Sequence, residues 1–137
     1  MSKFAALDLG RVVAAHGRHC VVESPEGERT ICHPRGKKSD CVVGDLVRWQ
    51  SAGDEGVIEH IEPRRNLMHR QDEWKTKSFA ANLDAMLVIV AADPPFSESQ
   101  LARALIAAES AGISAHVLLN KCDLPQAAAA RERLAPY

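Results

Sequence analysis

The most informative part of this chain is His116-Val117-Leu118-Leu119-Asn120-Lys121-Cys122-Asp123. In it an apolar run leads directly into the tetrapeptide Asn-Lys-x-Asp. GTP-binding folds recognise guanine with this tetrapeptide at the carboxyl end of a buried strand. A carboxylate accepts two hydrogen bonds at once, here from guanine N1–H and the exocyclic amino group, and adenine offers no such donor pair. We therefore predict a guanine site at Asn120, Lys121, Cys122 and Asp123, with the Lys121 stem along the base.

No phosphate-binding loop precedes this motif. Such a loop needs Gly-x-x-x-x-Gly-Lys-Ser/Thr, whose backbone N–H groups and lysine hold the phosphates. The nearest imitation, Gly36-Lys37-Lys38-Ser39, has Ile31 in place of the first glycine and Lys38 in place of the hydroxyl residue. Asp-x-x-Gly, the usual partner of the γ-phosphate, is absent from the sequence as well. Two interpretations stay open: the phosphate-binding half follows Tyr137, or the tetrapeptide is a coincidence.

The composition is that of a soluble globular protein with one ordinary domain or two small ones, since 46% of the 137 residues are hydrophobic and 26% are charged. A net charge of −1 argues against a strongly basic nucleic-acid binder but allows a local basic patch. Without a secretory leader or a membrane-spanning run, we expect a cytoplasmic protein with free thiols. No Cys-x-x-Cys pair occurs, so no metal site is expected. The side chains considered for one are His16, His19, Cys20, Cys32, His33 and Cys41.

The first part of the chain has the rhythm of a small β-barrel. Short runs rich in Val, Ile, Cys or Trp are separated by turn residues such as Gly, Pro, Ser and Asp. Five strands in about 55 residues favour an OB-fold, which binds oligonucleotides on one face and in its loops; another small barrel stays an alternative. The predicted strands are residues 10–15, 18–23, 28–33, 45–50 and 56–62.

The last part of the chain changes to a β-α-β-α pattern. Residues 83–92 form an almost unbroken apolar run, as expected for a parallel strand covered on both faces. Ser97 is a suitable N-cap for a helix that ends before Gly112. A second strand over residues 115–119 leads into the tetrapeptide, and Pro125 opens another helix. Two strands cannot make a stable doubly wound sheet, so we predict the first piece of a larger α/β domain.

A basic segment joins the two parts. Residues 64–82 hold several cations and one tryptophan but show no clean period. They are the natural place for contacts with phosphates, while a solvated linker is the simpler interpretation. The predicted organisation is a barrel over 1–66, a basic linker over 67–82 and an incomplete domain over 83–137. The RNA-binding candidates are Arg35, Lys37, Lys38, Arg64 and Arg65.

Several segments together resemble one family. In order along the chain they are Pro34-Arg35-Gly36-Lys37, Val43-Gly44-Asp45-Leu46-Val47, Ile61-Glu62-Pro63-Arg64-Arg65-Asn66, Ala80-Ala81-Asn82-Leu83-Asp84 and Leu118-Leu119-Asn120-Lys121-Cys122-Asp123-Leu124. Their order and spacing are similar to those of the YjeQ/RsgA family of bacterial, circularly permuted GTPases. The resemblance extends over nearly the whole chain.

The resemblance implies an OB-fold, then a P-loop-type GTPase domain that begins with the guanine motif, then a zinc-binding C-terminal region. Family members bind the small ribosomal subunit and its rRNA late in maturation, and they use GTP and Mg²⁺. By position, Asn120, Lys121 and Asp123 correspond to the guanine site, and Arg35, Lys37, Arg64 and Arg65 lie in or near the RNA-facing barrel. The chain corresponds to the N-terminal portion, so we expect no catalytic residue, no bound cofactor and no GTP hydrolysis by this chain alone.

Two other functions stay open. The chain could be a stand-alone RNA-binding barrel whose β-α-β-α segment is a partner interface without a nucleotide function. It could also be a small structural protein in which residues 120–123 only cap a helix. If the apolar strands over residues 83–92 and 115–119 lack their sheet neighbours, we expect self-association through residues 83–137 or disorder in this part of the chain.

Overall fold

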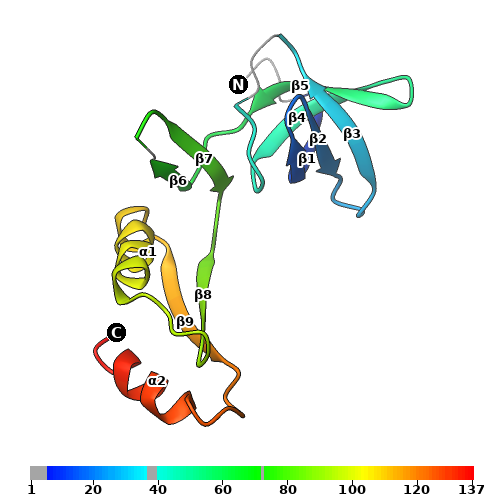
Figure 1. Ribbon diagram of the computed structural model, residues 1–137. Helices are drawn as coiled ribbons and strands as arrows, with labels where there is room; N and C mark the ends of the chain where they lie inside the picture. The colour runs from blue at the N-terminus through cyan, green and yellow to red at the C-terminus, as the bar shows by residue number, and fades with distance from the viewer. Residues whose placement is uncertain (1–5, 37–39, 72) are drawn as a thin grey trace. The chain divides into compact units, whose positions relative to one another are not determined.

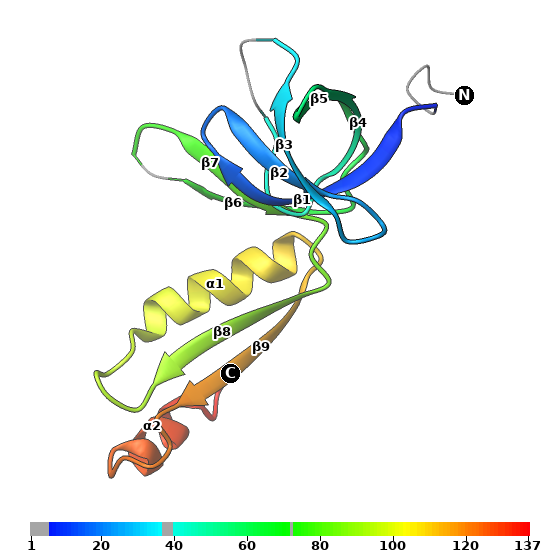
Figure 2. The ribbon, with the colours of Figure 1, turned by 90° about the vertical axis from the view of Figure 1, so that its right-hand side faces the viewer.

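The computed structural model describes residues 6–36, 40–71 and 73–137. The chain divides into two compact units, Met1–Leu83 and Asp84–Tyr137. The first unit is entirely β-structure and the second alternates strands and helices (Figures 1 and 2). No helix in the described part of the chain is both long enough and apolar enough to cross a lipid bilayer.

The first unit contains a closed five-stranded barrel. Its sheet order is β1-β2-β3-β5-β4, in which β3 and β5 are parallel and the other neighbours are antiparallel. This order and closure confirm the predicted OB-fold, and Figure 2 shows the strands curling around a common interior. The strands are β1 (Asp8–His16), β2 (His19–Glu23), β3 (Arg29–Pro34), β4 (Leu46–Ala52) and β5 (Glu55–Ile61).

The barrel core follows from the alternation of side chains along each strand. Val22 on β2 and Val47 on β4 are fully buried, and their strand neighbours are less buried. Trp49 is the one large aromatic side chain in this core cluster. Gly56 makes room for it, because a Cβ at position 56 would lie 2.7 Å from the Trp49 ring. With only 4% aromatic residues in the sequence, the barrel core consists mainly of small and β-branched side chains packed around one indole.

Three of the four cysteines lie in this core rather than at a metal site. Cys20 and Cys32 are partners across β2 and β3, and Cys41 is buried with them. Burial raises the pKa of the Cys32 thiol to about 11, and a hydrogen bond with Cys20 together with burial raises the pKa of Cys41. The Cys32 and Cys41 thiols therefore stay protonated near neutral pH, and a protonated thiol is a poor nucleophile. Among the described residues no group of His, Cys, Asp and Glu could hold a metal ion.

The segment expected to be a linker forms a β-hairpin. Its strands β6 (Leu67–Gln71) and β7 (Thr76–Ala81) are antiparallel, and the hairpin belongs to the same compact unit as the barrel. The base of the hairpin joins the barrel through a bridge between Val43 and Ala80. Met68 and Ala81 at this base are buried, whereas most residues farther along the strands are exposed. The sequence shows no apolar alternation because only the base of the hairpin is packed.

The second unit is the predicted β-α-β-α segment. Strands β8 (Ala85–Ala91) and β9 (Ser114–Asn120) are parallel, and helix α1 (Glu98–Ser110) makes the crossover between them. The Ser97 hydroxyl accepts a hydrogen bond from the Gln100 N–H at 3.3 Å, which confirms the predicted N-cap. Helix α2 (Ala127–Leu134) follows β9.

One face of the β8–β9 pair is exposed. Leu87, Ile89 and Leu118 are large apolar side chains on this face, and Ile89 is 65% exposed. Ile89 and Leu118 are partners in the strand register, so these side chains lie next to one another. The prediction that both faces of residues 83–92 are covered is therefore wrong for the chain alone. The apolar run nevertheless marks a strand that is suited to a larger sheet.

Candidate guanine-binding loop and nucleic-acid interface

The Asn-Lys-x-Asp motif begins at the last residue of β9. Asn120 pairs with Ala91 in the parallel register, and its carbonyl accepts the Ala92 N–H at 3.1 Å. The chain then turns at Lys121, which has a φ of +60°. The motif thus lies at the carboxyl end of a parallel strand pair, where open α/β sheets bind their ligands.

The four motif side chains are exposed and play different parts in the loop. Lys121 Nζ donates to the Asp93 carbonyl oxygen at 2.9 Å, which ties the loop after β9 to the loop after β8. The Cys122 thiol donates to the Leu119 carbonyl oxygen at 3.1 Å, so this side chain turns back toward the strand. The structure thereby holds the loop in place without using Asp123.

Asp123 presents an unengaged carboxylate. It makes no hydrogen bond or ion pair with any residue that the structure describes. Helix α2 takes Gln126 as its N-cap, and no side chain caps this helix end. The interpretation of residues 120–123 as a mere helix cap therefore finds no support in the geometry. An exposed carboxylate on an anchored loop can accept two N–H groups from a planar base.

The basic residues predicted to bind RNA are mostly engaged within the protein. Arg35 forms a two-point ion pair with Glu59, with its Nε 2.7 Å from Oε2, and this pairing raises the pKa of Arg35. The Glu59 carboxylate also accepts a hydrogen bond from Gln50 at 2.8 Å. Lys37 and Lys38 lie outside the described residues. Arg35 is thus an exposed cation whose charge is already balanced by a neighbour.

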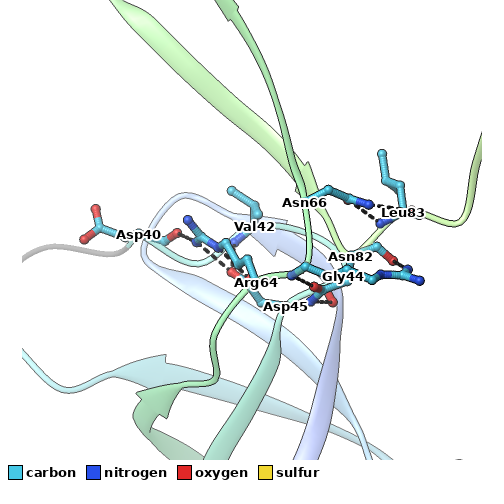
Figure 3. A network of polar contacts seen from close by, with 9 residues as sticks. Asp40, Val42, Gly44, Asp45, Arg64, Asn66, Asn82 and Leu83 are labelled. Carbon is cyan, nitrogen blue, oxygen red and sulfur yellow. Dashed lines mark hydrogen bonds and ion pairs between the residues drawn. The ribbon is translucent and has the colours of Figure 1, made fainter. Parts of the chain in front are cut away.

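Arg64 is a structural residue of the barrel. Its Nε lies 2.8 Å from Oδ1 of Asp45 and its terminal nitrogen 2.9 Å from Oδ2, so the two groups meet at two points (Figure 3). Asp45 is fully buried and also accepts the Val42 N–H at 2.9 Å. The same guanidinium reaches the Asp40 carbonyl oxygen, and the bond with Asp45 raises the pKa of Arg64. A buried carboxylate needs such a partner, which leaves Arg64 little capacity for an outside phosphate.

Two asparagines, to which the sequence alone assigns no role, connect the base of the β6–β7 hairpin to neighbouring backbone. Asn66 holds Leu83 at two points, with its side-chain N–H to the Leu83 carbonyl and the Leu83 N–H to its side-chain oxygen, both 2.7 Å. Asn82, at a φ of +56°, accepts the Arg65 N–H and donates to the Gly44 carbonyl (Figure 3). Arg65 also donates to the Asn82 carbonyl oxygen at 3.0 Å. Arg65 therefore helps to join the hairpin to the barrel.

Three histidines that the sequence marks as candidate metal ligands lie together on the barrel. The rings of His16 and His19 are 5.5 Å apart, and those of His19 and His33 are 6.1 Å apart. A surface pocket of about 420 Å³ opens beside them, lined by Arg18, His33, Pro34 and Gly36. His33 also contacts Glu55 at the start of β5 at 2.7 Å. This surface joins β2, β3 and the β1–β2 turn, the region through which OB-folds bind oligonucleotides.

An OB-fold barrel followed by a parallel β-α-β-α segment with Asn-Lys-x-Asp after its second strand is the order found in circularly permuted GTPases. The chain belongs to the RsgA GTPase family, whose model matches residues 61–137. Its fold is also similar to the crystal structure of YloQ, described as a circularly permuted GTPase, with a TM-score of 0.67 at 23% identity, over 100% of this chain and 48% of that one.

Curated relatives agree with this assignment. The chain is 64% identical over 129 residues to the small ribosomal subunit biogenesis GTPase RsgA of Variovorax paradoxus (strain S110). It is 52% identical over 130 residues to the protein of the same name from Ralstonia nicotianae. In both cases the match covers 93% of this chain and 41% of the relative. The chain thus spans about two fifths of the length of these relatives.

Proposed function

We propose that the chain is the N-terminal part of a cytoplasmic GTPase that acts in biogenesis of the small ribosomal subunit. In this proposal the barrel binds rRNA and residues 120–123 recognise the guanine of GTP. The observation that carries the guanine part is the exposed carboxylate of Asp123, which no described residue engages, on a loop that Lys121 anchors to the Asp93 carbonyl. The names of the relatives support the ribosomal part.

The residues at hand fit the base of GTP but not its phosphates. Asp123 supplies two acceptors for guanine, and the methylene stem of Lys121 can lie along the ring. The sequence has no Gly-x-x-x-x-Gly-Lys-Ser/Thr, so phosphate and Mg²⁺ binding are assigned to the remaining length of the family's chain. The family's zinc region is likewise assigned there. Phosphoryl transfer depends on positioning these groups, and this chain alone is therefore not expected to hydrolyse GTP.

Replacing Asp123 with alanine is expected to abolish the preference for guanine. Two charge-assisted hydrogen bonds contribute roughly 1.5–3 kcal/mol each, so the chain should bind GTP with about millimolar affinity at best, and ATP more weakly. Chemical-shift titrations of labelled chain with GTP and with ATP measure both affinities. Glu132→Ala removes another exposed carboxylate and should leave GTP binding unchanged. Nanomolar binding of GTP, or equal binding of both nucleotides, would contradict the proposal.

The rRNA part of the proposal rests on the pocket beside the β1–β2 turn rather than on Arg64. Arg18 is exposed and has no ion pair within residues 6–36, 40–71 and 73–137. Arg18→Ala is expected to weaken binding to small ribosomal subunits and to lower the log–log salt slope by about 1, the value for one lost phosphate contact. Co-sedimentation across a salt series measures this slope, with Arg103→Ala on α1 as the matched control. An unchanged slope for Arg18→Ala would refute this placement.

The second candidate function, a stand-alone RNA-binding barrel, makes a different prediction for the same variants. It would keep the effect of Arg18→Ala on subunit binding but show no guanine preference that depends on Asp123. The titrations and the salt series together separate the two functions.

The exposed β8–β9 face is also proposed to pair two copies of the chain. Leu87, Ile89 and Leu118 form an apolar surface that water solvates poorly. Sedimentation should show concentration-dependent dimers, and Leu118→Glu should make the chain monomeric. Ile106→Glu changes an exposed apolar residue on α1 and serves as the control. A monomer at every concentration would contradict this expectation.

A further inference from the structure

The β6–β7 hairpin carries an unusual set of exposed side chains beyond its packed base. Trp74, between the two strands, is 90% exposed, although its indole is among the most costly side chains to leave in water. Phe79 on β7 is also exposed. The other tryptophan of the chain, Trp49, is 7% exposed in the barrel core, so the two indoles have opposite environments.

Two cations face each other on the same hairpin. Arg70 on β6 and Lys77 on β7 are direct cross-strand partners, and both are exposed. Like charges in this position repel and destabilise a sheet. Neither side chain has an ion pair or hydrogen bond with any described residue. In the barrel, by contrast, the cross-strand partners Glu23 and Arg29 carry opposite charges and form an ion pair.

The aromatic and cationic side chains share the hairpin. Phe79 is exposed two residues along β7 from Lys77, at a β-bulge where Met68 pairs with Ala80 and His69 pairs with Ser78. The segment between the strands also holds the acidic residues Asp72 and Glu73, of which Asp72 lies outside the described residues. A ligand that carries both negative charge and planar rings would suit this hairpin. Its charge would relieve the repulsion between Arg70 and Lys77, and its rings would cover the exposed aromatic side chains.

We propose that the β6–β7 hairpin is a second RNA-binding element that takes unpaired nucleotides. Trp74 stacks on a base, Phe79 offers a further stacking surface, and Arg70 and Lys77 neutralise adjacent phosphates. Unpaired RNA is favoured over duplex RNA because only splayed bases can reach an aromatic side chain. A protein partner is less suited, since it would have to cover two unpaired cations. This inference deepens the proposed function, because it adds an RNA contact outside the barrel surface.

The test uses the whole chain and a fluorescently labelled, unstructured RNA of mixed sequence, with the same RNA annealed into a duplex as the comparison. Trp74→Ala is expected to weaken binding of the single strand between about fivefold and 150-fold, as for loss of one base–aromatic stack. Duplex binding should be weaker in the wild type and change less. Trp74→Phe should recover part of the affinity. Lys77→Ala should lower the salt slope by about 1, and Arg103→Ala should not.

Fluorescence gives an independent readout of stacking. Binding of unlabelled single-stranded RNA should quench Trp74, and the Trp74→Phe variant, which retains Trp49, should show no quenching. Unchanged single-strand affinity in Trp74→Ala overturns the inference. Loss of small-subunit binding without loss of RNA binding also overturns it and indicates a protein partner.

The same measurements distinguish this inference from the proposed function. If Arg18→Ala weakens RNA binding and Trp74→Ala does not, the barrel surface stands and the hairpin inference fails. If Trp74→Ala weakens binding and Arg18→Ala does not, the hairpin stands and the barrel assignment fails. A wild-type chain that binds neither RNA refutes both.

Discussion

Arg64→Met is expected to lower the free energy of unfolding of the first unit by about 3–5 kcal/mol, as for removal of one partner of a buried ion pair. Methionine keeps much of the side-chain volume but removes both bonds to Asp45, at 2.8 and 2.9 Å. The Asp45 carboxylate is fully buried and, among the described residues, would keep only the Val42 N–H as a donor. Urea unfolding followed by Trp49 fluorescence, in a Trp74→Phe background, measures the loss.

Two further variants show whether the loss of stability comes from leaving the buried Asp45 carboxylate without its ion-pair partner. Arg29→Met breaks the exposed ion pair with Glu23 and should cost at most about 1 kcal/mol. Asp45→Asn combined with Arg64→Met removes the buried charge together with its partner, so part of the stability should return. If Arg64→Met and Arg29→Met cost the same, the Arg64–Asp45 pair has no special structural role.

Gly44→Ala is expected to cost roughly 2–6 kcal/mol, the sum of backbone strain and overpacking. Gly44 has a φ of +96°, and a Cβ there would lie 1.9 Å from the Ala81 carbonyl oxygen. The Gly44 N–H also donates to the Val12 carbonyl at 2.8 Å, so the residue is held against both β1 and the end of β7. The backbone has to move, and the base of the hairpin should separate from the barrel. Thermal unfolding measures the cost.

Gly17→Ala is the matched control for this variant. Gly17 also has a positive φ, +62°, but a Cβ there would meet nothing within 4 Å. Its cost should therefore be only the strain of about 1–2 kcal/mol. Hydrogen exchange of the Ala81 N–H, which donates to the Val43 carbonyl, reports on hairpin attachment and should accelerate only in Gly44→Ala. Equal losses of stability in the two variants would contradict the close-contact explanation.

The elements of both units could be predicted because their signals are local. Alternating Val and Ile residues between turn residues predict the barrel strands, and β2 and β5 lie close to the predicted ranges 18–23 and 56–62. Ser97 and Gly112 mark the two ends of α1 for reasons of hydrogen bonding and backbone conformation. The β6–β7 hairpin could not be predicted in this way, because most of its strand residues face water and carry no apolar period.

The residues of the candidate site likewise fall into those that local sequence predicts and those that depend on long-range contacts. The motif at residues 120–123 was visible because side-chain type and spacing within four residues suffice to suggest base recognition. The roles of the arginines were not visible, since Arg35 and Arg64 find their acids 24 and 19 residues away in sequence. The sequence marks the histidines of the barrel as candidate metal ligands, and the contacts between their rings depend on the register of β1, β2 and β3.

Periodicity, helix caps and short motifs act between near neighbours in the chain. The residues alone therefore predict a β-rich first part, a β-α-β-α last part and an Asn-Lys-x-Asp motif at the end of a strand. Which charges remain available to a partner depends instead on the folded chain. Closure of the barrel buries Asp45 and commits Arg64 to it, and the hairpin register sets Arg70 against Lys77. Electrostatic energy depends on distance and burial, and both arise from contacts between residues far apart in the chain.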